Sequence, residues 1–414
     1  MKRSDSSLLQ KVSMLVFSLL PMLAWYKIPF PVGLGYALVL IFSTYTIARS
    51  QFKINIVPFS FWVVFAYICI MWMYNHNFAM WTLFPPGGWN FFIFLLALLW
   101  GILTFNLSLL KKYMRWIILI SGILFWIQFV LLYTTGSSQF CFVPNLTGAF
   151  TYEDCTYSDI VARHLEGLPS SIFLEKSYLA YYYLTYLALI WFETDKRGKQ
   201  TSWELLFVIV TLIASRSGTA LVGFSILFSI KIFSIYWTAD IRRRALLIIM
   251  FIPLILGVAY LYIDSEFGQT MLSRSEELSI EGSSGYTRVI AGYIMFDQLE
   301  TQEKLLGISN ASERFGYEKE DGNFVFYVNG VQSILLSLGY IGAVLYLLFY
   351  ASIFRKVKLK SKICITVLLV MSLLESNYLN PYMMLLTIIP CAEAYYKNSY
   401  EKNNASLRHP SRSN

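Results

Sequence analysis

Charged side chains are scarce in this chain: they make up 14% of its 414 residues, whereas hydrophobic residues make up 57%. A soluble globular domain has about one-quarter charged residues, so the composition excludes a soluble enzyme as the whole molecule. Histidine occurs three times, and the five cysteines form no CxxC pair. Since no HExxH motif or carboxylate-rich repeat accompanies them, a metal site is disfavoured and we expect no metal or cofactor.

Long apolar stretches fill most of the chain instead. Each is bounded by Lys/Arg clusters or by Gly, Pro and Asn, as bilayer-spanning helices of about 20 residues are. The pattern predicts an all-α polytopic membrane protein with about twelve transmembrane helices. The twelve stretches are 12–26, 32–48, 56–74, 91–108, 116–134, 177–192, 205–214, 219–237, 245–263, 324–354, 363–374 and 382–396. The seventh and eleventh are too short to cross alone, so they must thin the bilayer, lie within protein or form a re-entrant hairpin.

The basic residues predict the orientation, because cytoplasmic loops retain Lys and Arg. With both termini in the cytoplasm, 24 of the 33 basic residues lie inside and 18 of the 25 acidic residues lie outside. The arginines at 242–244 stay inside only if the chain turns at 215–218. The basic N-terminus resembles a signal peptide, but no small-x-small cleavage site follows it. We therefore expect a multi-pass protein of the bacterial inner membrane with an uncleaved first helix.

Two long connections fall on the outer side, at residues 135–176 and 264–323. They divide the predicted helices into a block of five (1–134), a block of four (177–263) and a block of three (324–396), followed by a cytoplasmic tail (397–414). Long ordered loops carry function more often than connection alone requires. Any chemistry is therefore expected on these two loops.

The first long loop ends in a cluster of ionisable side chains: Arg163, His164, Glu166 and Glu175. One interpretation is an interfacial helix whose charges, His164 included, face water. The alternative is a catalytic group. Glu175 is the best candidate, since the apolar sequence beside it disfavours the ionised form, as suits a general base.

The cysteines divide by location. Cys141 and Cys155 lie in the first long loop, on the side where the compartment is oxidising, and we predict that they form a disulfide. Cys69, Cys364 and Cys391 lie in apolar stretches and are interpreted as small hydrophobic residues.

Arginines mark the second long loop and the turn before it. Arg274, Arg288 and Arg314 are spread through an acidic segment. Arg288 precedes an apolar stretch, 289–296, that is predicted to lie in the interface as a half-buried helix. An arginine at a helix N-terminus suits an anion, and pairing with neighbouring glutamates is the alternative. Arg216 lies at or below the outer membrane surface, where it either snorkels to the head groups or lines a cavity that holds an anion.

Several of these residues carry a resemblance to a known family. The segment EKSYLA at 175–180, preceded by Arg163 and Gly167, resembles the R...G...EPSYLA element of Wzy-type O-antigen and capsule polymerases. Lys176 stands where that element usually has proline. The SRSG turn at 215–218 resembles the SR turn that these polymerases share with O-antigen ligases.

Two features of the second loop extend the resemblance. Arg288 resembles the arginine that opens the amphipathic loop helix, and NGVQSILLSLGYIG at 329–342 resembles the helix that closes the loop. The spacing from Arg274 to Gly285 also resembles an Arg-x10-Gly pattern of some polymerases. The resemblance covers about residues 163–349 and implies a GT-C-like fold.

The family implies glycosyl transfer outside the cytoplasmic membrane. A growing glycan leaves its polyprenyl pyrophosphate carrier and joins the non-reducing end of a new lipid-linked repeat unit, with inversion and without a metal. Fixed guanidinium groups suit this chemistry, because they stabilise the charge on a departing pyrophosphate. The implied partners are polyprenyl-pyrophosphate-linked oligosaccharides, membrane lipid and a chain-length regulator in the membrane, and no nucleic acid.

Roles follow for single residues. Arg216 and Arg288 are assigned to the pyrophosphate. The further candidates for phosphate or sugar are Arg163, Arg274 and Arg314. Glu175 is the first candidate for the general base and Asp321 the second. Tyr327 and Asn329 are expected on the substrate side, where Tyr327 either stacks on a sugar or anchors the chain at the interface.

Two other classes stay open as alternatives. An O-antigen ligase of the related fold is expected to use a histidine near the start of the helix after the second loop, but the segment DGNFVFYVNGVQ at 321–332 contains none. A flippase or transporter for lipid-linked oligosaccharides normally shows repeated halves with charges inside the spans. Here the charges concentrate in the outer loops of the second half, which favours the polymerase.

Overall fold

The computed structural model describes most of the chain. The described residues are 7–23, 26, 33–49, 56–75, 86–144, 157–166, 169–192, 200–238, 280, 286–309, 311–318, 324–325, 328–373 and 381–408.

Helices dominate the described part, as predicted for an all-α protein. The apolar helices are α1 (Leu8–Leu23), α2 (Leu34–Arg49), α3 (Phe59–Asn75), α4 (Pro86–Thr104), α5 (Leu107–Thr135), α7 (Lys176–Trp191), α8 (Gln200–Ala214), α9 (Gly218–Thr238), α16 (Gly330–Phe354), α17 (Leu359–Met371) and α18 (Pro381–Arg408). The shorter elements are α6 (Tyr157–Glu166), η3 (Thr287–Ala291), α13 (Gly292–Asp297), α14 (Thr301–Leu306), α15 (Ala311–Phe315), β1 (Tyr317–Glu318) and β2 (Phe324–Val325). The two strands pair antiparallel.

The apolar helices indicate a membrane protein. Within the described ranges, α5, α9 and α16 are long and apolar enough to cross a membrane. One face of α5 packs inward, whereas its outward face is also apolar, which is typical of a helix in lipid and unusual for a soluble helix. The exposed apolar residues on this face are Trp116, Ile120, Ile123, Ile127 and Val130.

The apolar stretches of the sequence agree with the helices at most positions. Eleven of the twelve overlap described helices, and the ninth, 245–263, lies outside the described residues. The tenth was wrong at its start, because Phe324 belongs to β2 and the helix begins at Gly330. The reason is a capping box: the Asn329 side chain accepts from the Gln332 backbone N–H, and the Gln332 side chain accepts from that of Asn329.

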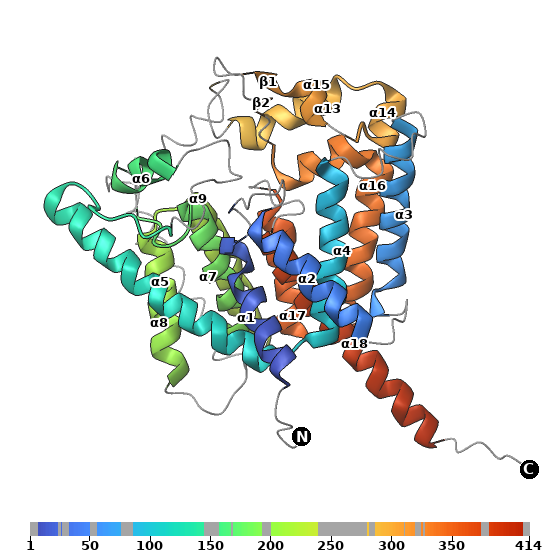
Figure 1. Ribbon diagram of the computed structural model, residues 1–414, viewed down its shortest axis with the longest axis horizontal. Helices are drawn as coiled ribbons and strands as arrows, with labels where there is room; N and C mark the ends of the chain where they lie inside the picture. The colour runs from blue at the N-terminus through green and yellow to red at the C-terminus, as the bar shows by residue number, and fades with distance from the viewer. Residues whose placement is uncertain are drawn as a thin grey trace, which may run out of the picture.

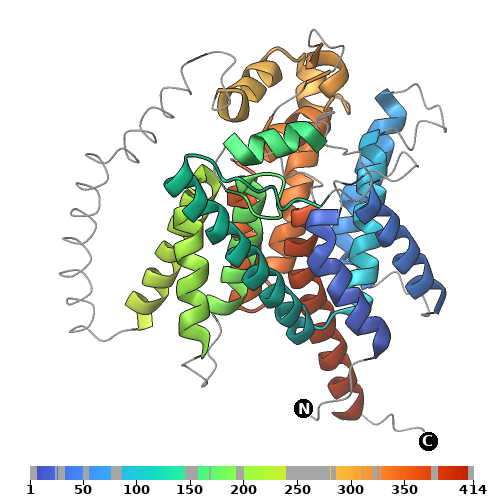
Figure 2. The same ribbon diagram turned by 60° about the vertical axis from the view of Figure 1, so that its left-hand side comes forward.

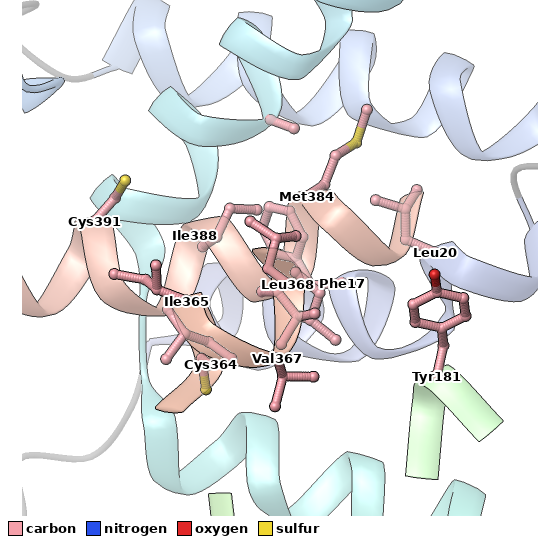
Figure 3. Packing of buried hydrophobic residues seen from close by; sticks show 14 of the residues in the cluster. Phe17, Leu20, Tyr181, Cys364, Ile365, Val367, Leu368, Met384, Ile388 and Cys391 are labelled. Carbon is pink, nitrogen blue, oxygen red and sulfur yellow. The ribbon is translucent and has the colours of Figure 1, made fainter. Parts of the chain in front are cut away.

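The core is built around α7, in which every residue from Leu179 to Ile190 is buried. It packs against α5, α8, α9, α17 and α18. Figure 3 shows part of this packing, with side chains of α1, α7, α17 and α18 meeting in one cluster. Cys364 and Cys391 are fully buried there as free thiols, in agreement with their interpretation as small apolar residues.

The short elements gather at one end of the helical body. Figures 1 and 2 both place α6, α13, α14 and α15 at this end, whereas α1 begins and α18 ends at the opposite end. The described parts of both long connections therefore share one side. We call this the loop-bearing end.

The second long connection is fixed to α16 by two glycines. The backbones of Gly307 (φ +83) and Gly339 (φ +64) are in close contact. A Cβ on either residue would come within 3.0 Å of the backbone of the other segment. The Ile308 N–H donates to the Leu336 carbonyl at 2.9 Å. Gly339 also interrupts the helical conformation of α16, so this helix bends where the loop docks.

Candidate functional site at the loop-bearing end

Arg163 and Glu175, predicted from the first long loop, come together in the structure. Glu175 is the residue immediately before α7, and its Oε1 lies 4.0 Å from Nη1 of Arg163. The Ser177 hydroxyl donates to the other carboxylate oxygen at 3.2 Å. The side chains are 50% and 27% exposed, so the pair is worth at most about 1 kcal/mol to stability. Both groups are therefore accessible to a ligand.

His164 contradicts the expectation that its side chain faces water. It is 2% exposed, and its Nε2 lies 3.3 Å from the Leu174 carbonyl and 3.1 Å from the Ser170 hydroxyl. Burial lowers its pKa from the ordinary 6.5. The cause of the inward orientation is helical spacing: His164 lies one turn after buried Ile160.

Arg216 occupies the predicted turn between α8 and α9. Its backbone is left-handed, with φ +46, and both flanking residues, Ser215 and Ser217, are buried. The guanidinium carbon lies 5.6 Å from the ring centroid of Tyr133, near the end of α5. The side chain is partly buried and its guanidinium lies over an aromatic ring, a contact that keeps the cation at this end.

The end of α5 joins Arg216 to the first loop. The Arg216 guanidinium lies over the ring of Tyr133. Four residues after Tyr133, the Ser137 hydroxyl donates to the Leu165 carbonyl of α6 at 3.0 Å. The Ser138 hydroxyl donates to the carbonyl of His164. The Arg216 turn and the Arg163–Glu175 pair are therefore attached to the same helix end.

Arg288 lies on the predicted amphipathic helix, which the structure forms as η3 followed by α13. η3 is a π-helix, a form frequent at functional sites, and the Arg288 side chain lies outside the described atoms. Gly292 and Phe296 face α16, with Phe296 edge-on to the Tyr340 ring. The outward face borders a hollow of about 380 Å³, lined by Val289, Ile290, Tyr293, Ile294, Asp297 and Gln298.

Two further candidates have structural partners. Arg314 forms an ion pair with Glu303 of α14 and lies over the Phe315 ring. It therefore fits the alternative in which the loop arginines pair with neighbouring glutamates. Asn329 is 1% exposed and caps α16, which explains its position without a substrate. Arg274, Asp321 and Tyr327 lie outside the described side chains.

Cys141 is a free, half-buried thiol in the structure. It packs beside Tyr26, Val143 and Ile160, and burial raises the pKa of its thiol. Its proposed partner, Cys155, lies outside the described residues, so the disulfide stays a prediction.

The chemistry available at the loop-bearing end is that of guanidinium groups beside a carboxylate. Arg163 and Arg216 suit an anionic ligand, and Glu175 suits proton transfer. Among the described side chains, no three His, Cys, Asp or Glu residues are placed to hold a metal ion. Comparisons of this chain with protein families, with curated proteins and with solved structures gave no match.

Proposed function

We propose that this chain is a polymerase of the Wzy type, which joins polyprenyl-pyrophosphate-linked repeat units into O-antigen or capsular polysaccharide on the external face of the inner membrane. The observation that carries the proposal is the placement of Arg216 and the Arg163–Glu175 pair around one end of α5. These are the positions that match the family motifs.

The proposed reaction is a single displacement at the anomeric carbon of the donor sugar. A hydroxyl at the non-reducing end of the acceptor attacks, a new C–O bond forms, and the bond to the pyrophosphate oxygen breaks with its electron pair. Glu175 takes the hydroxyl proton. Arg216 and Arg288 bind the departing lipid pyrophosphate, whose developing charge guanidinium groups stabilise without a divalent cation.

The proposal includes twelve spans, cytoplasmic termini and a GT-C-like arrangement. Support comes from the apolar helices, from the common end of the two loops (Figure 1) and from the excess of basic residues in the segments assigned to the cytoplasm. The loop-bearing end is external in this arrangement. A chain-length regulator in the membrane is the proposed protein partner.

Deletion of the gene in its host tests this function. The surface glycan is examined by gel, and we expect lipid-linked single repeats without a ladder. Arg216→Ala and Arg288→Ala should each fail to restore the ladder at normal protein abundance, because each removes a charge from the leaving group. Lys397→Ala is the matched control, since this exposed cation lies on α18, away from the loop-bearing end.

The rival functions give different gels. Polymer that accumulates on its lipid without transfer indicates a ligase, and repeats trapped on the cytoplasmic face indicate a flippase. Normal ladders from both arginine variants would refute the assignment of the site.

A further inference from the structure

The segment that leads to Glu175 is held by a buried polar network. Gln128, fully buried on α5, donates to the Phe140 carbonyl at 2.7 Å and accepts from the Ser171 N–H at 2.8 Å. The Ser171 hydroxyl donates to the Ser121 carbonyl at 2.6 Å. Because buried polar groups are costly without partners, this arrangement fixes one conformation of the backbone. These hydrogen bonds end at Ser171, so residues 172–175 need a separate attachment.

His164 supplies that second attachment. A carbonyl oxygen only accepts hydrogen bonds, so the 3.3 Å contact with Leu174 is a hydrogen bond when Nε2 carries the proton. The Ser170 hydroxyl lies within 3.4 Å of both ring nitrogens. His164 therefore bonds directly to the residue before Glu175, while its neighbour Arg163 faces the Glu175 carboxylate.

We infer that His164, as the neutral Nε2–H tautomer, is a positioning residue that holds Glu175 opposite Arg163. It touches neither substrate nor carboxylate and acts through the Leu174 carbonyl. The catalytic consequence rests on the proposed function, whereas the attachment and its tautomer do not.

The electrostatic surroundings of the ring are specific. Among the described side chains, Glu175 is the charged group that acts on the ring, and Arg163 carries the neighbouring positive charge. The side chain in hydrogen-bond contact with the ring is the neutral hydroxyl of Ser170, and Ser138, from the loop after α5, binds the His164 backbone carbonyl. Burial lowers the pKa of the His164 ring more than the Glu175 carboxylate raises it, so the neutral ring is favoured.

Ring labelling tests the tautomer directly. The protein holds three histidines, His76, His164 and His409, so nitrogen NMR of ring-labelled full-length protein in lipid vesicles gives few signals, and His164→Gln identifies the one of interest. We expect a neutral ring protonated at Nε2 at about pH 6.5, where an ordinary histidine is half charged. A charged ring, or a proton on Nδ1, would overturn the inference.

Variants test the positioning. The side-chain amide introduced by His164→Gln can donate to Leu174 and accept from Ser170 without titrating, whereas His164→Leu can do neither. Hydrogen exchange of residues 172–179 should accelerate at least about tenfold in the leucine variant and return close to wild type in the glutamine variant. Ala162→Gln, at an exposed position of α6, is the control. Equal exchange in both His164 variants would sink the inference.

Activity provides the readout that a structural role alone would not move. For His164→Leu we expect kcat for joining lipid-linked repeats to fall about tenfold to a hundredfold, with KM nearly unchanged. His164→Gln should recover most of this loss, because its side-chain amide can again donate to the Leu174 carbonyl. If wild-type protein polymerises nothing, the proposed function fails, and exchange and NMR still decide whether His164 holds the segment.

Discussion

At the scale of single residues, Arg216 has a left-handed backbone, as do three other described residues that are not glycine: Gln139, Ser171 and Ser309. A left-handed residue that is not glycine costs about 1 kcal/mol, and helices commonly end with glycine in this conformation. In this chain the residue with this conformation at the end of α8 is an arginine, Arg216, with φ +46. Because such strain is frequent at functional sites, we expect this position to require the arginine side chain.

Replacing Arg216 with glycine separates stability from function. The change relieves about 1 kcal/mol of strain and loses a cation–π contact of about 0.5–1 kcal/mol, so the free energy of unfolding should stay within about 1 kcal/mol of wild type. Arg216→Ala loses the contact without relief and should be less stable than the glycine variant. Thermal unfolding in detergent measures both. The glycan ladder should be absent in each, and a normal ladder from Arg216→Gly would contradict the role of the guanidinium.

The positions of the candidate side chains could be predicted from sequence only where charge and motif agree. Arg163, Glu175 and Arg216 were placed correctly near the entry to α7 and in the α8–α9 turn. The inward direction of His164 was missed, because adjacent helical residues point about 100° apart and packing decides which one is buried. The four-residue spacing from Ile160 to His164 could have predicted the inward direction, because residues four apart lie on the same face of a helix.

At the scale of elements, the contact between Gly307 and Gly339 decides how the second loop sits on α16. Gly339→Ala adds a methyl group that meets the Leu305 carbonyl, in addition to the strain of φ +64. We expect a loss of about 2–4 kcal/mol, since backbone on both sides cannot yield. Thermal unfolding and proteolysis of the second loop measure it, and the loop should become the first site of cleavage.

Gly136→Ala is the matched control for this prediction. Gly136 also has a left-handed backbone, with φ +79, but nothing lies within 4 Å of its Cβ position. It should therefore lose only about 1 kcal/mol. Equal losses in the two variants would show that backbone strain alone, and not the close approach of the loop, makes glycine necessary at 339.

Element boundaries could be predicted from hydropathy only approximately: the fifth apolar stretch was predicted to begin at 116, whereas α5 begins at Leu107. The start of α16 was missed because hydropathy continues through Phe324, although Asn329 and Gln332 have the spacing of a capping box. The bend at Gly339 has no such local signal. It depends on a loop residue 32 positions earlier in the chain, Gly307, and a contact of that kind cannot be inferred from the run of apolar residues around it.

At the scale of the whole molecule, two independent asymmetries agree. The sequence assigns most basic residues to one side and most acidic residues to the other. The helical body separately carries α6 and α14 at one end and the end of α18 at the other (Figures 1 and 2). The charge distribution predicts that these segments lie on opposite sides of the membrane, and the shape of the helical body is compatible with that prediction.

Thiol labelling tests this sidedness. In a background without native cysteines, Ala162→Cys on α6 and Thr301→Cys on α14 should react with a membrane-impermeant maleimide in intact spheroplasts, because both positions are exposed at the loop-bearing end. Lys397→Cys on α18 should react only after permeabilisation. Labelling of Lys397→Cys alone would invert the protein and place Arg163 and Arg216 in the cytoplasm. Since the carrier lipid of the proposed reaction is used on the external face, that result would remove the polymerase proposal while leaving the fold intact.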